Sequence, residues 1–257
     1  MWGNQVPPHP LHEARMRDVG MREPHPHVTA FPRHRVPASH MSQILILMAK
    51  QPAAGQTKTR LCPPLSQAQA AQLYAGMLRD TLALAHHVPG VQPAIAVNPA
   101  GAEGYFAELA PDALLFPQGP GDLAQRLAHV TGAAFASGAR AVAALSSDVP
   151  MLPVVYLRQA FALLAQYDCV LGPCEDGGYY LAALRQPAPT LFTKVTMSTP
   201  NVLRDTMAEA ERLGLRVALL PACYDVDTPA DLARLCADPA PMPATRAALE
   251  ALGDTVA

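Results

Sequence analysis

The feature that most constrains this chain is a short apolar run at residues 43–48, Gln-Ile-Leu-Ile-Leu-Met, followed by a regular alternation of strand-like and helix-like segments. An uninterrupted apolar run of this length is typical of a strand that is buried on both faces of a parallel sheet. A stretch of helical periodicity separates most of the later apolar runs, as βαβ units require. The pattern predicts an α/β fold in which helices pack on a mostly parallel sheet.

The positions of the elements follow from apolar periodicity and helix-capping residues. Strands are expected at residues 43–48, 94–97, 113–116, 141–145, 169–171, 179–184 and 216–220. Helices are expected at residues 66–86, 103–109, 121–136, 153–166 and 199–213, with a final helix from residue 228. The strands at 169–171 and 179–184 are joined through a Gly-Gly turn, which predicts an antiparallel excursion. No further element is predicted in the Pro- and Ala-rich segment after residue 238.

The first forty residues differ from the rest of the chain. They hold six of the nine histidines and seven prolines, and their apolar residues have no regular period. Such a segment cannot bury enough surface to offset its ordering entropy. We interpret residues 1–40 as a disordered His/Pro-rich extension, or as sequence upstream of a true start at Met41, and expect one domain over residues 41–257. The irregular histidine spacing argues against a metal-binding tract.

Charge and cysteine content exclude several classes of protein. The formal net charge is −2, and no basic face that would bind nucleic acid is evident. No apolar run approaches the roughly 20 residues that a membrane span needs, and the N-terminus lacks a secretory signal. The five cysteines are odd in number and never spaced as C-x-x-C, which favours free thiols in a reducing compartment. We therefore expect a soluble, cytoplasmic protein with no nucleic-acid or membrane partner.

Ligands of open α/β sheets bind outside the carboxyl ends of the strands, so the loops there are the candidate sites. The first loop, residues 49–61, holds Lys50 and Lys58, two of only three lysines in the chain, together with Arg60. Flexible cations, a guanidinium and the backbone around Ala49 and Gly55 suit a nucleotide diphosphate. The spacing fits neither a Walker loop nor a dinucleotide fingerprint. A solvated basic turn is the alternative.

Aspartates after two other strands predict a metal site. Asp148 follows the strand at 141–145 and can hold Mg²⁺ or Mn²⁺ that bridges diphosphate oxygens; alternatively, it caps the next helix. Asp225 and Asp227 alternate in an extended segment and should point to the same side. One of them can join Asp148 on the cation, and we prefer Asp227. Thr228 and Asp231 form a helix N-terminal signature instead.

The loop Gly-Pro-Cys-Glu-Asp-Gly-Gly-Tyr-Tyr at residues 172–180 predicts an acceptor site. Two carboxylates, Glu175 and Asp176, precede Gly177, Gly178 and Tyr179 at a strand end. Such a tight loop would let an acceptor approach closely, and Asp176 is the better candidate for a general base. The alternative is a simple hairpin turn.

A weaker nucleotide-binding signal lies at residues 118–127. Asp122 and Arg126 can contact nucleotide or substrate. They can equally begin a helix and lie on its solvated face.

Five segments resemble a known family. They are MAKQPAAGQTKTRL at 48–61, GDLAQRL at 121–127, SDVP at 147–150, GPCEDGGYYL at 172–181 and DVDTP at 225–229. They resemble bacterial GT-A-like transferases found beside radical-SAM and selenodomain proteins, some of which are described as arsenosugar biosynthesis glycosyltransferases. KTRL at 58–61 with MLRD at 77–80 is similar to 2-phospholactate guanylyltransferase, and the layout is similar to molybdenum-cofactor guanylyltransferase. The family often carries Trp where this chain has Met197.

The resemblance implies a GT-A, nucleotide-diphospho-sugar transferase fold: a three-layer α/β/α sandwich with a mixed, mostly parallel sheet and a divalent metal. The expected activity is metal-dependent glycosyl transfer from a nucleoside diphosphate sugar to a small-molecule acceptor. Asp148 and Asp227 would hold Mg²⁺ or Mn²⁺, Lys58 and Arg60 the diphosphate, and Asp176 would position or deprotonate the acceptor. The alternative is a nucleotidyltransferase that moves NMP from an NTP to a phosphorylated small molecule. A non-catalytic nucleotide-binding module would not need all three acids.

Overall fold

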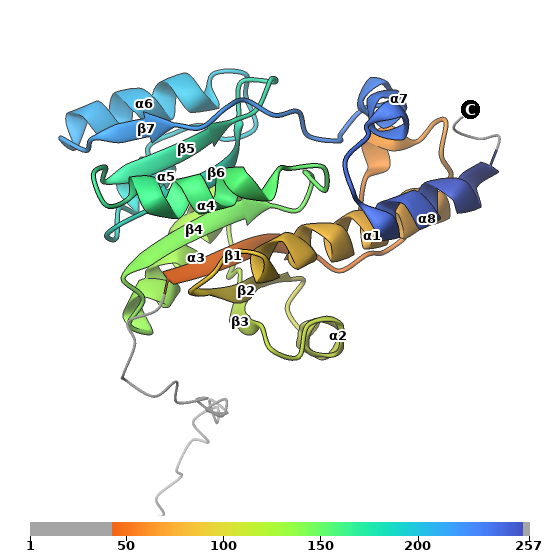
Figure 1. Ribbon diagram of the computed structural model, residues 1–257, viewed down its shortest axis with the longest axis horizontal. Helices are drawn as coiled ribbons and strands as arrows, with labels where there is room; N and C mark the ends of the chain where they lie inside the picture. Colours follow the sequence, from red (N-terminus) through yellow and green to blue (C-terminus); the bar gives the residue numbers. More distant parts are fainter. Residues whose placement is uncertain (1–42, 254–257) are drawn as a thin grey trace, which may run out of the picture. The chain divides into compact units, whose positions relative to one another are not determined.

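The computed structural model describes residues 43–253, which build one seven-stranded sheet covered by helices (Figure 1). The expected extension at residues 1–40 and the domain boundary at Met41 lie outside the described residues. The strand order is β3-β2-β1-β4-β6-β5-β7. No helix within residues 43–253 combines the length and the apolar character that crossing a membrane requires.

The elements have the following bounds. The strands are β1 (Gln43–Lys50), β2 (Val91–Asn98), β3 (Leu114–Pro117), β4 (Ala141–Ser146), β5 (Cys169–Pro173), β6 (Tyr179–Leu184) and β7 (Val217–Leu219). The helices are α1 (Gln67–His86), α2 (Glu103–Leu109), α3 (Leu123–Ala136), α4 (Val154–Leu163), α5 (Thr190–Thr193), α6 (Val202–Arg212), α7 (Pro229–Ala237) and α8 (Pro243–Leu252). A short 3₁₀ turn, η1, covers Thr59–Leu61.

Strand direction explains where a site can form. β1 pairs in parallel with β2 and β4, and β2 in parallel with β3. β6 is antiparallel to both β4 and β5, which confirms the expected excursion, and β7 is parallel to β5. Because β6 reverses direction between two strands that run the same way, the carboxyl ends of β1, β4, β5 and β7 all lie at one edge of the sheet. The loops predicted to carry the chemistry follow these four strands.

The alternation of side chains along β1 shows how the sheet is sandwiched. Leu45 and Leu47 are buried in the core shared with α1, α4, α7 and α8. Ile44 and Ile46 point to the other face and pack with Val130 and neighbouring residues of α3. Both faces are therefore covered, which confirms the three-layer α/β/α arrangement.

Two helices were not expected from the sequence, the short α5 and the longer α8. Helix α8 lies against α1 (Figure 1), and no side chain of its own caps its N-terminus. The carboxylate of Asp80 on α1 instead accepts hydrogen bonds from the backbone N–H groups of Ala244 (3.1 Å) and Thr245 (2.6 Å). Gly76 makes room for this contact, because a Cβ there would lie 2.7 Å from the Ala244 carbonyl oxygen. A capping residue more than 160 positions away leaves no local signal in the sequence.

Candidate functional site

A cavity of about 640 Å³ lies at the carboxyl-end edge of the sheet. Its polar side is formed by four aspartates from the loops after β4, β5 and β7: Asp148, Asp176, Asp225 and Asp227. Its other side carries apolar residues, Met48, Leu123, Leu127, Met197 and Val202. The parallel direction of the four strands brings these distant segments together, as expected for an open α/β sheet.

Asp148 lies two residues after the end of β4, and hydrogen bonds of its own backbone fix its position. Its N–H donates to Ser146 Oγ (3.2 Å), and its carbonyl oxygen accepts from the N–H of Val226 (3.0 Å). The second hydrogen bond joins the loop after β4 to the loop after β7. The alternative that Asp148 caps the next helix is wrong, because Pro153 occupies the N-cap position of α4 and no side chain caps it.

Lys58 lies between two of the four aspartates, Asp148 and Asp227. Its backbone is left-handed, with φ of 51°, and its side chain is only 5% exposed. The ammonium group contacts Asp148 Oδ1 at 2.8 Å and Asp227 Oδ1 at 2.9 Å, and donates to the carbonyl oxygen of Val226 at 2.6 Å. Burial alone would lower the pKa of Lys58, but the two carboxylates outweigh burial and raise it. The Lys58 ammonium group thus donates to three acceptors of the protein itself. It is therefore not the free phosphate-binding cation that the sequence suggested.

Arg60 is the cation of this loop that is open to a ligand. Its side chain is 76% exposed, and its nearest carboxylate oxygen is Asp227 Oδ2, 3.5 Å away. It lines both the large cavity and an adjoining one of about 220 Å³, which Lys50, Lys58, Tyr74 and Asp148 also line. The ammonium group of Lys50 donates to the Gln56 carbonyl oxygen at 2.8 Å within the loop. The predicted basic loop therefore borders the site, with Arg60 as its most exposed charge.

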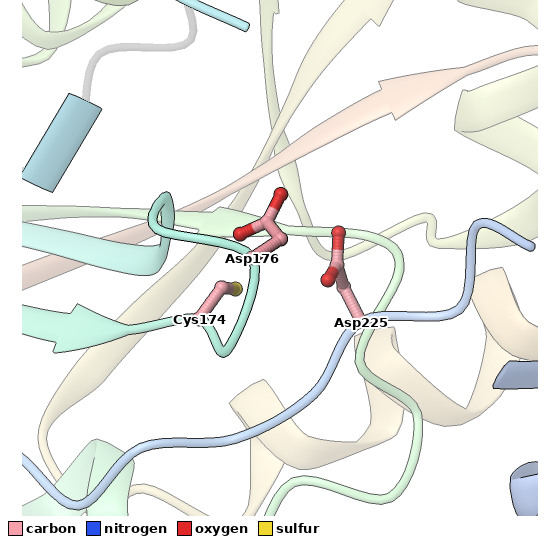
Figure 2. Close-up of side chains that lie close together, drawn as sticks. All are labelled: Cys174, Asp176 and Asp225. Atoms are coloured by element: carbon pink, nitrogen blue, oxygen red, sulfur yellow. The ribbon is translucent and has the colours of Figure 1, made fainter. Parts of the chain in front are cut away.

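Asp176 and Asp225 face one another across the loops after β5 and β7, with the Cys174 thiol beside them (Figure 2). One ligand atom from each of the three residues lies within 4.8 Å of the others. The N–H of Gly178 donates to Asp176 Oδ1 at 2.8 Å and orients this carboxylate. Burial, with the charges of Asp176, Asp227 and Asp148, raises the pKa of Asp225 to about 6. Burial, Asp225 and Asp176 likewise raise the pKa of the Cys174 thiol.

Asp225 and Asp227 behave as the alternating pair that the sequence predicted. Both line the cavity, and Val226 between them is fully buried. Their contacts differ, since Asp227 pairs with Lys58 and Arg60 while Asp225 has aspartate neighbours. The sequence preferred Asp227 as the metal ligand, but the unrelieved negative charge is at Asp225. Four carboxylates facing two cations leave a surplus of negative charge, which fits a divalent cation.

The remaining residues of the expected acceptor loop have separate contacts. Gly178 and Tyr179 line the cavity. Gly177 has φ of 91°, and a Cβ there would collide with the Pro200 carbonyl oxygen, so this position requires glycine.

Glu175 does not line the cavity but forms a two-pronged ion pair with Arg234 of α7, at 2.7 and 2.9 Å. The guanidinium lies over the Tyr224 ring, 3.9 Å from its centroid. The structure therefore places Glu175 in a contact between loop and helix, not on the expected acceptor surface.

The other expected nucleotide-binding residues do not line the main cavity. Ala49 is buried in the sheet, and Gly55 is exposed with φ of 72°. Asp122 caps α3 in a reciprocal pair of hydrogen bonds with Gln125, and Arg126 is half-buried on the same helix. None of these four expected residues lines the larger cavity. Helix initiation, the alternative considered for Asp122, accounts for its contacts.

Comparison with known proteins supports the fold. Residues 81–199 match the family DUF2064, described as an uncharacterized protein conserved in bacteria. A search of curated proteins found no match. A proposed nucleotide-diphospho-sugar transferase from Desulfovibrio desulfuricans G20 is 29% identical, with a TM-score of 0.77, over 83% of this chain and 96% of its own.

Two more distant structures share the fold. CMP:2-keto-3-deoxy-manno-octonic acid synthetase, solved with CTP, is 14% identical, with a TM-score of 0.51, over 76% of this chain and 97% of its own. The 4-diphosphocytidyl-2C-methyl-D-erythritol synthase of Anaerococcus prevotii DSM 20548 is 10% identical, with a TM-score of 0.50, over 74% and 92%. The chain therefore has the expected GT-A-like fold, and its neighbours support the expectation of a transferase.

Proposed function

We propose that this protein transfers a sugar from a nucleoside diphosphate sugar to a small-molecule acceptor, with the help of a divalent cation. One observation carries the proposal: aspartates from three loops and the exposed Arg60 meet at one cavity, where negative charge exceeds positive charge. A cation together with a diphosphate would balance this arrangement, because the metal takes carboxylate oxygens and the guanidinium takes phosphate oxygens.

The similarity to the Desulfovibrio protein supports the choice of donor. It is described as a proposed nucleotide-diphospho-sugar transferase, and the match covers most of both chains. The cavity volume of about 640 Å³ is within the usual range for small-molecule sites. Its apolar side, which includes Leu123, Leu127 and Met197, offers a surface for the less polar part of an acceptor or donor.

Each side chain would have a distinct task. Asp148, Asp225 and Asp227 would hold Mg²⁺ or Mn²⁺, which when bound would neutralise charge on the leaving diphosphate. Lys58 would keep Asp148 and Asp227 fixed in place, since it contacts both. Arg60 would bind diphosphate oxygens from the open side of the cavity.

Asp176 would orient the acceptor and accept its proton. One of its oxygens is held by the Gly178 N–H, which leaves the other free to accept a hydrogen bond from an acceptor hydroxyl or thiol. The apolar wall would exclude water from the reacting atoms. Most of the rate enhancement would come from charge stabilisation at a preorganised site, with proton transfer to Asp176 as a smaller contribution.

The test is to incubate the full chain with Mg²⁺ or Mn²⁺, a panel of nucleoside diphosphate sugars and NTPs, and a panel of small acceptors. We expect release of nucleoside diphosphate that needs both the cation and an acceptor. Release of pyrophosphate from an NTP would contradict the proposal and indicate nucleotidyl transfer. Tight nucleotide binding without any product across both panels would indicate a non-catalytic module. Asp168 lies at the opposite edge of the sheet, just before β5, where it pairs with Arg185 and Arg216, so Asp168→Asn is the control for Asp148→Ala.

A further inference from the structure

Cys174 has no part in the transfer mechanism, yet its thiol points into the acidic group. The residue directly follows β5, and its backbone N–H is fixed by a hydrogen bond to the Gly178 carbonyl oxygen at 3.0 Å. It is only 7% exposed, and among the described residues its sulfur has no hydrogen-bond partner. Figure 2 shows this sulfur beside the carboxylates of Asp176 and Asp225. A buried, unpartnered donor atom aimed at two acids calls for an explanation.

The distances suit a shared cation. The sulfur and one oxygen from each aspartate lie within 4.8 Å of one another. Atoms that bind one zinc ion at about 2.0–2.3 Å are at most about 4.6 Å apart, twice the longer bond, so small side-chain rotations would complete the site. Neither Asp176 nor Asp225 has a lysine or arginine within ion-pair distance in the described part of the chain, whereas Asp148 and Asp227 share Lys58.

We propose that Cys174, Asp176 and Asp225 form a mixed thiolate and carboxylate site that binds a thiophilic divalent cation such as Zn²⁺. A sulfur ligand favours zinc-like ions over Mg²⁺, which prefers oxygen. Binding converts the Cys174 thiol to a thiolate with the release of its proton to water, and no electrons are transferred. Asp225 then belongs both to this site and to the Mg²⁺ or Mn²⁺ site proposed above with Asp148 and Asp227.

The inference rests on the proposed function only because both place the active site in this cavity. Binding of the cation is measured without substrate. An ion held by Asp176 would block the acceptor from that carboxylate, or it would bind the acceptor itself.

The experiment is a titration of the reduced, full-length protein with Cd²⁺, a probe whose bond to sulfur gives a thiolate-to-metal charge-transfer absorption. All five cysteines lie outside the His-rich first forty residues, so binding by that segment gives no such signal. We expect one equivalent of the absorption, which is displaced by Zn²⁺ and persists in excess Mg²⁺. Cys174→Ser and Cys174→Ala should both abolish it, with circular dichroism as the check on folding.

Controls separate this site from other thiols and acids. Cys223, which is joined to Cys174 by an isolated β-bridge, and Cys236 are the control thiols: Cys223→Ser and Cys236→Ser should leave the absorption intact. Asp225→Asn should weaken Cd²⁺ binding by about tenfold or more, a loss comparable to that seen when even an outer-shell partner is removed. Absorption that is absent from the wild type, survives in the folded Cys174 variants, or depends on Cys223 overturns the inference. Sugar transfer without the absorption overturns only this site, and the absorption without transfer overturns only the proposed function.

Discussion

Aspartates at the two edges of the same sheet have opposite charge environments. Asp168 precedes β5 at its amino end and contacts Arg185 at 2.7 Å and Arg216 at 3.0 Å. Hydrogen bonds from Arg216, together with the charges of both arginines, lower the pKa of Asp168. At the carboxyl end of the same strands, burial and three neighbouring carboxylates raise the pKa of Asp225 to about 6.

The difference separates a structural group from a candidate site. Two arginines balance the charge of Asp168: Arg185, just after β6, and Arg216, just before β7. Asp168 therefore links β6 and β7 to the start of β5 and needs no ligand. At the carboxyl ends of the strands, the carboxyl-end group consists of four acids, Asp148, Asp176, Asp225 and Asp227, with only two cations nearby, Lys58 and Arg60. This excess of negative charge costs stability unless a ligand relieves it. Surplus like charge in a cavity, and not the presence of acids, is therefore what indicates function here.

Replacing an acid at each edge should produce the largest contrast. Asp148→Ala should lower the transfer rate by about 100-fold or more, because it removes a proposed ligand of the cation that would stabilise charge. Asp168→Asn should leave the rate within about twofold, since its partners lie far from the reacting atoms. Steady-state rates at saturating donor provide the measurement. Equal losses in the two folded variants would remove the distinction between the edges.

The cations that pair with the acids at the two edges, Lys58 and Arg185, should also differ in their contribution to stability. Lys58→Met removes the ammonium group buried between Asp148 and Asp227 and should lower the free energy of unfolding by about 3 kcal/mol in chelator. Arg185→Met removes an exposed partner of Asp168 and should cost about 1 kcal/mol or less. Urea unfolding measures both. Mg²⁺ should restore part of the loss only in Lys58→Met, because a divalent cation can occupy the vacated negative site.

Neutralising the acids themselves should shift stability in opposite directions. Asp225→Asn removes like-charge repulsion and should stabilise the metal-free protein near neutral pH by about 1 kcal/mol after solvent screening. Asp168→Asn removes favourable partners and should destabilise it. Thermal unfolding in chelator gives the sign directly. A destabilised Asp225→Asn variant would show that the negative charge of Asp225 is already balanced in the metal-free protein.

The pH dependence provides the smallest but most specific contrast. Asp225 has a folded-state pKa of about 6, above its unfolded value of about 3.9, so the folded state binds the proton more tightly. The stabilising effect of Asp225→Asn should therefore shrink as the pH falls through 6 towards 4. The lowered pKa of Asp168 acts in reverse: its contribution is present above about pH 4 and is lost only in stronger acid. Measuring the free energy of unfolding of both variants at several pH values tests this contrast. An Asp225→Asn effect that grows as the pH falls from about 6 to 4, or an Asp168 contribution that is lost above about pH 4, would contradict it.

The sequence predicts the fold well because local signals and topology agree. The strands and most helices follow from apolar period and capping residues, and the capping boxes at Ser66, Asp122 and Thr228 are present as such signals imply. The rule that ligands bind at the carboxyl ends of strands then brings Lys58, Asp148, Asp176 and Asp227 to one edge. Helix α8 was missed although Pro243 in its first turn is a local signal; only the contribution of Asp80, which caps it from another helix, has no trace in the local sequence.

The charge balance of the site cannot be predicted from the sequence. Nothing local distinguishes Asp225 from Asp227, since the alternation places both side chains in the cavity. Only the fold brings Lys58 to Asp227 and leaves Asp225 facing Asp176 and Cys174. For the same reason, Glu175 looks equivalent to Asp176 in sequence, yet it pairs with Arg234 of α7. Long-range ion pairs decide which charges remain available to a ligand.

The most direct test of the account is nucleotide binding followed by thermal unfolding, with a nucleoside diphosphate added in the presence and absence of Mn²⁺. Binding to the native state raises the midpoint by mass action. We predict a rise that needs both nucleotide and cation in the wild type and in Asp168→Asn, and that is lost in Asp148→Ala. A rise that ignores the cation, or that survives unchanged in Asp148→Ala, would contradict the claim that the acidic edge of the sheet holds a metal and a diphosphate together.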